Sequence, residues 1–218
     1  MSTPSSPSRS YRSTLRAEQA AATRRRILAA AGASFASAGY AGTSLADIAR
    51  EASVSVETVK LNGPKRELLL ASFEQAFAGD EGHEGIAERE VGRRIMEVGD
   101  PDELLAAWVR FVAEANARAG RLWRSLVSAG TSDPLVREAL DAQQVRRHAD
   151  FRAAIDLFVE RGMLRGEAPG DAERDRLADV LSFLASPEGY EQLVDGAGWS
   201  QPEFETWLVG AVKALVLA

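Results

Sequence analysis

Hydrogen-bonding side chains cluster in residues 55–62, and their chemistry suits contact with DNA. Thr58, Lys60 and Asn62 carry groups that fit base edges or phosphate oxygens. Leu61 could contact the methyl group of a thymine. Each residue alone is more typical of a solvated surface. Their spacing within one short stretch predicts that they face a major groove together.

Two short helices must position this cluster. Ser44 and Asp47 form a capping-box pattern, which predicts the start of a first helix that ends near Ser53. Ser55 can cap the second helix, and Val56 turns that helix back onto the core. We therefore expect a helix, a tight turn and a second helix whose outer face is polar.

A phosphate site is expected where the next helix begins. Pro64 suits a first helical turn because its missing N–H is not needed there. Lys65 follows at this N-terminus, where a cation and free backbone N–H groups together favour a phosphate. The residues predicted to contact DNA are Thr23, Arg24, Thr43, Ser44, Ser55, Val56, Glu57, Thr58, Lys60, Leu61, Asn62 and Lys65.

Three segments of this region follow a known pattern in register: TRRRILAAAGASFASAGYAGTSLADIA (23–49), VSVETV (54–59) and PKRELL (64–69). In the first of them, Phe35 is followed by Gly39 and Tyr40, which end the first helix of the pattern. With these motifs, residues 20–75 resemble the DNA-binding domain of the TetR family of transcriptional repressors. The resemblance implies a three-helix DNA-binding head followed by a helical domain that binds an effector and forms a dimer.

Three positions depart from the family pattern. Ser53 replaces the usual glycine of the turn, and we expect it near the left-handed region at modest cost. Lys60 stands where the family usually has an aromatic residue that touches the DNA backbone. The segment 60–65 is one residue shorter than the commonest form. These departures bear on the base contacts and leave the architecture unchanged.

The distribution of charge along the chain agrees with one DNA-binding end. The chain holds 26 Lys and Arg against 32 Asp and Glu, a formal net charge of −6. Residues 1–79 hold 10 basic and 6 acidic side chains, whereas residues 80–218 hold 16 basic and 26 acidic ones. A basic front and an acidic back suit a protein that contacts phosphates at one end only.

Several functional classes lack their sequence signals. The chain has no cysteine, only His83 and His148 as imidazoles, and no GxSxG, P-loop or GxGxxG motif, so we expect no enzyme and no cofactor. The acidic run at 80–84 is interpreted as a solvated loop and not as a metal site. No apolar run reaches the ~18 residues of a membrane helix, and no signal peptide is visible. We expect a soluble, cytoplasmic protein without membrane contact.

The predicted fold class is all-α, in three parts. Residues 1–17 form a disordered Ser-, Pro- and Arg-rich arm, which either reaches DNA or has no role. Residues 18–66 form the helix-turn-helix domain, and residues 67–218 form a helical effector-binding and dimerisation domain. Helices are expected at 16–38, 64–77, 101–118 continuing through 121–130, 134–162, 173–186 and 202–218.

Aromatic residues gather in the middle helices of the second part. They are Trp108, Phe111, Trp123, Phe151 and Phe158. The family resemblance places an effector cavity among these helices, and such rings would favour an apolar or aromatic small molecule. Candidate polar anchors are Arg110, Asn116, Arg147 and His148. The alternative is that the rings are simply core, which is the usual role of aromatics at helical spacing.

The last two long helices are strongly apolar. Phe183 lies in one of them, and Trp207 and Leu215 lie in the other. The resemblance implies that both helices pair with their copies in a second subunit, and two heads about one helical turn apart would then bind a palindrome. The alternative is that both helices are buried within one monomer.

The hypothesis from the sequence is a regulator, most simply a repressor, that binds a palindromic operator as a homodimer. A small molecule in the C-terminal domain would release it from double-stranded DNA by a population shift. The alternative is a helical ligand-binding or scaffold dimer whose DNA-binding head has decayed.

Overall fold

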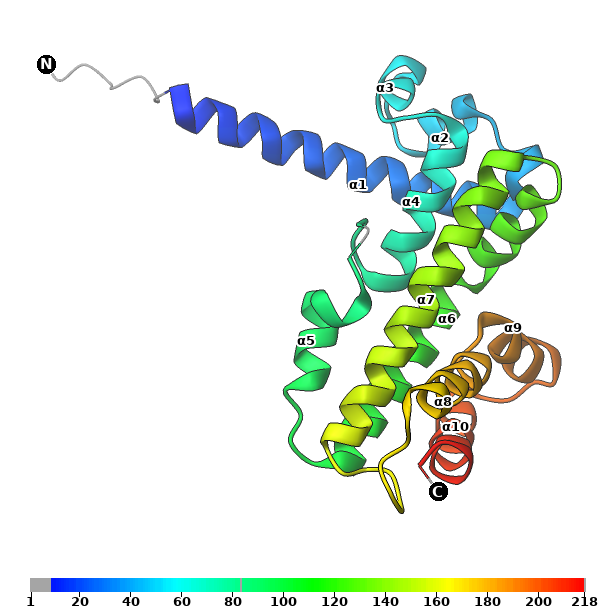
Figure 1. Cartoon of the computed structure of the whole chain (residues 1–218). Coiled ribbons are helices and arrows are strands. Elements are labelled where there is room, and N and C mark those ends of the chain that lie inside the picture. The colour runs from blue at the N-terminus through cyan, green and yellow to red at the C-terminus, as the bar shows by residue number, and fades with distance from the viewer. Residues whose placement is uncertain (1–8, 83, 218) are drawn as a thin grey trace, which may run out of the picture.

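The structure describes residues 9–82 and 84–217, with side chains from Leu15 onward, and within these ranges the regular secondary structure is entirely helical. In this computed structural model a head formed by the end of the first helix and the two short helices after it lies at one end, joined by long helices to a bundle at the other (Figure 1). The predicted all-α class is confirmed.

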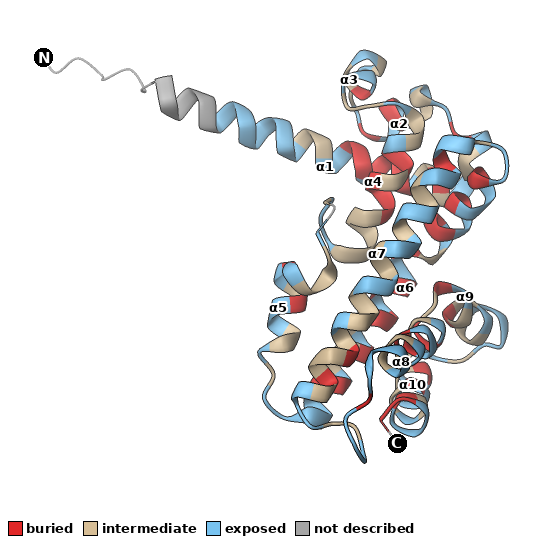
Figure 2. Ribbon diagram, in the orientation of Figure 1, coloured by how far each residue is buried: buried red, intermediate tan, exposed pale blue. Residues whose placement is uncertain are grey.

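The first helix, α1 (Arg9–Gly42), is longer than predicted, and its N-terminal part projects from the body (Figure 1). The disordered arm predicted at 1–17 is therefore wrong for residues 9–17, while residues 1–8 lie outside the described residues. The stretch LRAEQAAA (15–22) consists of strong helix formers, which extend the helix although all its side chains are exposed (Figure 2). Near the other end Gly39, at φ 71° and ψ 174°, kinks α1 in a conformation that glycine adopts readily.

The next two helices are α2 (Leu45–Glu51) and α3 (Val56–Leu61). Ser44 and Asp47 form the predicted capping box, and the side chain of Ser55 accepts a hydrogen bond from the backbone N–H of Thr58 at 3.1 Å. Ser53 adopts φ 53°, as expected for a residue in place of glycine. The local signals of the sequence therefore produce the predicted helix-turn-helix.

Two long helices follow the linking helix α4 (Lys65–Ala78). Between α4 and them lie a 3-10 turn, η1 (Ile86–Glu88), and α5 (Glu90–Met96), neither of which was predicted. The long helices are α6 (Pro101–Gly130), which continues through Gly120 as expected, and α7 (Pro134–Glu160). They pack side by side along most of the molecule (Figure 1).

The C-terminal part consists of α8 (Asp171–Leu184), α9 (Pro187–Tyr190), the π-helix η2 (Glu191–Gly196) and α10 (Gln201–Leu215). Pro187 is the first residue of α9, which Ser186 caps. Helices α8 and α10 pack on each other, on the N-terminal half of α6 and on the C-terminal half of α7.

Two hydrophobic cores hold the chain together. The first joins α1, α2 and α3 to α4 and to the C-terminal half of α6, and includes Phe35, Ile48, Val59, Leu68 and Leu126. The second joins the other half of α6 to α7, α8 and α10. The predicted boundary after residue 66 does not coincide with a break in packing, because α4 belongs to the core of the head.

Candidate DNA-binding face and ligand cavity

The outer face of α3 presents three side chains to solvent. Glu57, Lys60 and Leu61 are exposed, and Leu61 is 89% exposed, more than any other large hydrophobic residue that the structure describes. The Nζ of Lys60 lies 3.9 Å from a carboxylate oxygen of Glu57. This ion pair is weak and open to solvent, so Lys60 remains available to a phosphate. An apolar side chain held out beside a cation suits a groove that offers phosphates and thymine methyls.

The other predicted contacts of this helix turn back onto it. The amide of Asn62 donates to the carbonyl of Thr58 at 2.8 Å, and the Thr58 hydroxyl lies 2.9 Å from that of Ser55. Val56 is half-buried and packs against the first core. These four residues shape and cap the helix in this conformation.

Thr43 is the clearest correction among the predicted contacts. It is only 3% exposed, and its hydroxyl lies within hydrogen-bond distance of the carbonyls of Ser34 and Gly39. It therefore satisfies carbonyl groups at the kinked end of α1, and its side chain does not reach the surface. Ser44 is exposed, but its hydroxyl and backbone N–H both bond the carboxylate of Asp47.

Arg24 lies on α1, next to the half-buried Thr23, and joins the end of α3 to the loop after α4. Its Nε and Nη2 donate to the two carboxylate oxygens of Glu81 at 2.6 and 2.7 Å, and its Nη1 donates to the backbone carbonyl of Asn62. The hydrogen bonds to Glu81 raise the pKa of Arg24. In this conformation the guanidinium is occupied by protein groups, which the sequence prediction of a phosphate contact did not foresee.

Lys65 stands at the start of α4, as predicted, with an additional contact. Its Nζ lies 4.5 Å from the ring centroid of Tyr40, and partial burial lowers its pKa. The hydroxyl of Tyr40 donates to Asp133, before α7, at 3.3 Å. Tyr40 of α1 therefore positions the Lys65 cation at the N-terminus of α4, and its bond to Asp133 links α1 to the turn between α6 and α7.

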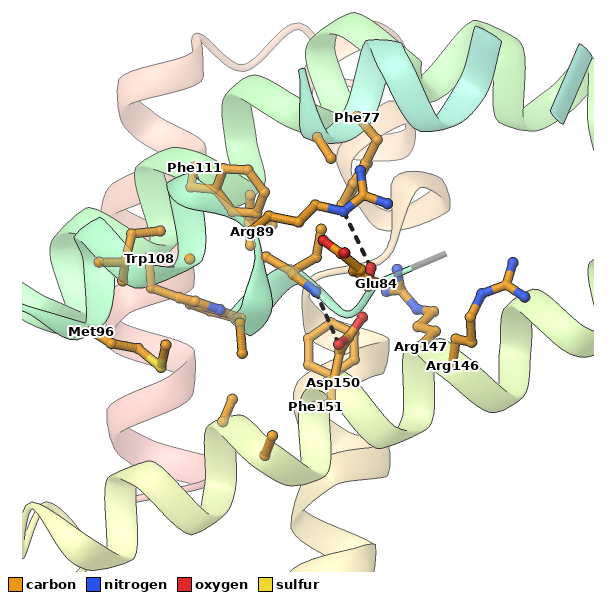
Figure 3. A pocket seen from close by; sticks show the side chains of 18 of the residues that line it. Phe77, Glu84, Arg89, Met96, Trp108, Phe111, Arg146, Arg147, Asp150 and Phe151 are labelled. Carbon is orange, nitrogen blue, oxygen red and sulfur yellow. Dashed lines mark hydrogen bonds between the residues drawn. The ribbon is translucent and has the colours of Figure 1, made fainter. Parts of the chain in front are cut away.

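A cavity of about 170 Å³ lies among α4, α5, α6 and α7 (Figure 3). All five aromatic residues predicted to contact a ligand line it: Trp108, Phe111, Trp123, Phe151 and Phe158. Two of these rings, Trp108 and Phe151, meet edge to face at 6.3 Å between centroids. The structure therefore gathers the predicted rings around one space.

Further cavity residues were missed by the sequence prediction. Phe73 and Phe77 reach the cavity from α4, and Ile95 and Met96 reach it from α5. The i, i+4 spacing of the two phenylalanines on an expected helix was the available signal. No comparable signal revealed α5, whose seven residues, EVGRRIM, are too few to show a helical period.

A buried arginine fastens the loop that closes one side of the cavity. Arg89 is 8% exposed and donates to the backbone carbonyls of Asp80, Gly82 and Glu84. The bond to Glu84 is visible in Figure 3. The sequence predicted a solvated loop here. The structure adds that the loop backbone is bound to Arg89 at Asp80 and Gly82, before His83, and at Glu84, after it. His83 itself lies outside the described residues.

The predicted polar anchors divide into one inside the cavity and three outside it. Arg147 lines the cavity, as does the unpredicted Asp150, which accepts a hydrogen bond from the backbone N–H of Ile86 at 3.1 Å. Burial raises the pKa of the Asp150 carboxyl. The anchors that do not line the cavity are Arg110, Asn116 and His148.

Each misplaced anchor has a position that explains it. Asn116 is buried under α8 and α9, where its amide donates to the carbonyl of Ala185 at 3.2 Å. His148 faces α8, with Nδ1 3.2 Å from Asp179. Arg110 lies beside a separate surface depression. Helical spacing alone did not reveal which side of α6 or α7 each residue occupies.

Helices α8 and α10, which pack on each other, both expose large apolar side chains. Phe183 is 77% exposed and Leu215 is 59% exposed, while Leu181 and Leu208 of the same helices are buried. Both helices therefore have one apolar face inside the subunit and a second apolar face in solvent. Such a patch is typical of a protein interface.

The described ranges contain neither a metal-binding cluster nor a membrane-spanning helix. Residues 9–82 and 84–217 hold no group of three or more His, Asp or Glu side chains placed to bind a metal ion. Within the same ranges, each helix is too short or too polar to cross a bilayer.

Comparison with known proteins bears on the helix-turn-helix and on the overall fold. Residues 27–60 match the family described as "Bacterial regulatory proteins, tetR family". A solved structure from Mesorhizobium loti MAFF303099, assigned to the TetR family of transcriptional regulators, is similar with a TM-score of 0.66 and 24% identity, over 89% of this chain and 95% of that one. Comparison with curated proteins gave no match. The family resemblance stated from the sequence is confirmed.

Proposed function

We propose that this chain, a member of the tetR family of bacterial regulatory proteins, is a ligand-responsive repressor that binds a palindromic operator as a homodimer. A small apolar or aromatic molecule in the cavity releases it from DNA. The observation that carries this proposal is the position of α4. Its first turn carries Lys65 beside the DNA-binding face, and its later turns carry Phe73 and Phe77 into the cavity.

The DNA-binding role is supported by the exposed residues around α3. The side chains of Lys60 and Leu61 are exposed on α3, and those of Arg25 and Arg26 are exposed on α1. A single six-residue helix contacts few bases, so useful specificity requires two copies.

The dimer is supported by the exposed apolar patch on α8 and α10. Burying Phe183 and Leu215 against the same residues of a second copy would satisfy both patches through one two-fold axis. Such a dimer places the two heads at the far ends of the α6–α7 pairs, free to enter successive major grooves.

The release mechanism is a population shift between two placements of α4 and the head. Arg118 of α6 holds the last carbonyls of α4, those of Ala76 and Phe77, at 2.9 and 3.2 Å. Arg24 links the loop after α4 to the end of α3. A ligand that moves Phe73 or the loop therefore changes where the recognition helix lies, provided that it binds the released state more tightly.

A second candidate function is a helical ligand-binding dimer whose head no longer binds DNA. Glu57 beside Lys60 favours this alternative, because a carboxylate on the groove face repels phosphates. Turning Thr58 and Asn62 back onto the helix also reduces the polar groups available for base contacts.

A gel-shift assay separates the two candidates. The purified protein is tested against DNA from upstream of its own gene and against a randomised duplex of equal length. A repressor gives a specific band whose affinity falls steeply with salt. A folded dimer that gives no specific band even at low salt supports the second candidate. As a cytoplasmic DNA-binding regulator, the protein would need neither a membrane contact nor a catalytic group.

A further inference from the structure

We propose that the ligand of the cavity is an aromatic molecule bearing a carboxylate, which Arg147 binds. The inference rests on the proposed function, because it names the class of small molecule to which the regulator responds. Two observations support it: the hydrogen bonds that the Arg147 guanidinium makes and leaves open, and the aromatic rings that line the same cavity.

Arg147 is anchored on one side and open on the other. Its Nε and Nη2 donate to the hydroxyl and carbonyl of Ser182 at 3.0 and 2.8 Å, and its guanidinium carbon lies 4.7 Å from the ring centroid of Phe151. Its Nη1 makes no hydrogen bond to any residue within the described ranges. The side chain is thus held in place with one charged donor left for a ligand (Figure 3).

The charge of Arg147 has no ion-pair partner within 4.0 Å in the part of the chain that is described. The two other arginines of the cavity do, since Arg89 pairs with Asp80 at 3.0 Å and Arg146 lies 3.8 Å from Glu74. Burial lowers the pKa of Arg147, and the nearby carboxylates of Glu188 and Asp150 oppose this shift without forming an ion pair with it. A guanidinium remains charged at neutral pH, and a desolvated cation that lacks a close ion pair is costly, so an anion bound directly beside it would be favoured.

Three acidic residues line the cavity: Glu74, Glu84 and Asp150. Asp150 accepts from the backbone of Ile86, and Glu74 accepts from the backbone N–H of Gly82 at 3.2 Å, so both carboxylates hold the segment that closes the cavity. Asp150 also acts on the charge of Arg147, but without a hydrogen bond between the two side chains.

A second donor lies one helical turn from Arg147. The side-chain oxygen of Gln143 accepts from Arg146 at 2.6 Å, and its amide nitrogen makes no hydrogen bond to a described residue. Residues 143 and 147 share one face of α7 and both line the cavity. Two spare donors on one face match the two oxygens of a carboxylate.

The remaining walls suit a ring. Trp108 and Phe151 meet edge to face, as do Phe77 and Phe111 with centroids 5.9 Å apart. Aromatic ligands gain from such offset and edge contacts beyond their buried area. A cavity of about 170 Å³ favours a compact one- or two-ring acid.

Matched pairs of ligands test the inference. Phenylacetate and 2-naphthoate are titrated into the full-length protein against their primary amides, which have the same shape without the charge. Trp108 and Trp123 line the cavity, so their fluorescence reports binding, with calorimetry as a second readout. At least one acid should bind roughly ten-fold or more tightly than its amide. Amides that bind as well as the acids, or acids that fail to bind at millimolar concentration, overturn the inference.

Variants separate the charge from the packing. Arg147→Met should remove the preference for the acid, whereas Ser182→Ala, which keeps the cation but loses its anchor, should retain it. Arg110→Met is the matched control, because this arginine of α6 lies outside the cavity, and it should change nothing. If Arg147→Met unfolds, Arg147→Lys, with its charge shifted, should weaken acid binding more than amide binding. Specific DNA binding measured without ligand reports separately on the proposed function, so the two failures are distinguishable.

Discussion

The guanidinium of Arg24 and the carboxylate of Glu81 form a two-pronged ion pair, although 57 residues separate them in the sequence. The same arginine donates to the backbone carbonyl of Asn62, which caps the end of α3. Glu81 lies in the loop that Arg89 fastens beside the cavity. One side chain therefore contacts both the recognition helix and the wall of the proposed effector site.

We expect Glu81→Ala to tighten operator binding roughly two- to five-fold, the range typical of an exposed ion pair. The substitution removes a carboxylate that competes with phosphate for Arg24. It should also increase amide hydrogen exchange around residues 60–63, because the guanidinium is no longer held against Asn62. Glu84→Ala, in the same loop without a contact to Arg24, is the control. Unchanged exchange and affinity in the Glu81 variant would show that the link carries no coupling.

Leu61→Ser should separate DNA recognition from folding. Because this side chain is 89% exposed, we expect unfolding free energy to change by less than about 0.5 kcal/mol. Operator affinity should fall roughly five-fold, with a changed preference at one base position in each half-site. Selection from a randomised duplex library measures both effects.

Lys65→Ala provides the contrasting result for a phosphate contact. It should weaken binding to all sequences alike and reduce the salt slope by about 1 per subunit. If Leu61→Ser gave the same sequence-independent loss, the assignment of the base-contacting face would be wrong.

Ser53→Gly should stabilise the protein by about 1 kcal/mol, because φ 53° is unfavourable for a residue with a Cβ atom. Chemical denaturation measures the change. Ser55→Ala, two residues away, should have the opposite sign and cost about 1 kcal/mol, since it removes the cap of α3. A destabilising Ser53→Gly would mean that the hydroxyl contributes more than the backbone conformation costs.

The capping box of α2 should show its own pH dependence. Hydrogen bonds from Ser44 lower the pKa of Asp47 from 3.8 to about 2. A lowered pKa means that the ionised carboxylate stabilises the folded state fully above pH 3.8 and loses this effect as the pH falls through 2. Asp47→Asn should therefore lower Tm relative to the parent at pH 5, and the difference should shrink between pH 4 and pH 2. A Tm difference that is constant over this range would exclude the carboxylate as its cause.

Phe183→Asp should produce a monomer, because it places a charge in the centre of the exposed patch on α8 and α10. Loss of the second head should weaken operator binding on the order of a hundred-fold. Leu135→Asp is the control, since this residue is also exposed but lies at the start of α7, away from that patch. Light scattering measures the oligomeric state, and a dimer that survives Phe183→Asp would place the interface elsewhere.

Local signals predicted the head well because each acts within a few residues. The Ser44 capping box, the Ser55 cap and the turn at Ser53 all depend on neighbours in the sequence and are present as expected. Thr43 was misplaced because its burial depends on carbonyl groups brought to it by the kink at Gly39, which a helical pattern does not reveal.

The cavity shows the same division. The family resemblance placed a cavity among the middle helices, and helical spacing indicated that their five aromatic residues turn inward. Whether a polar residue lines the cavity depends on its direction around the helix axis, which the sequence did not reveal. Arg147 lines the cavity, whereas His148, its neighbour in sequence, lies beside Asp179 of α8. Long-range pairs such as Arg24 with Glu81 leave no trace in a single sequence.

The core shared by α1, α4 and α6 limits how this protein can be recombined with its relatives. Ser72 of α4 donates to the carbonyl of Leu28 at 3.0 Å, and Ser125 of α6 donates to that of Phe35 at 2.8 Å. A chimaera joined after residue 66 would leave Leu68 and its neighbours facing a foreign surface. Exchange of operator specificity within the family should therefore proceed by substituting α3 alone, and not by transplanting the whole amino-terminal unit.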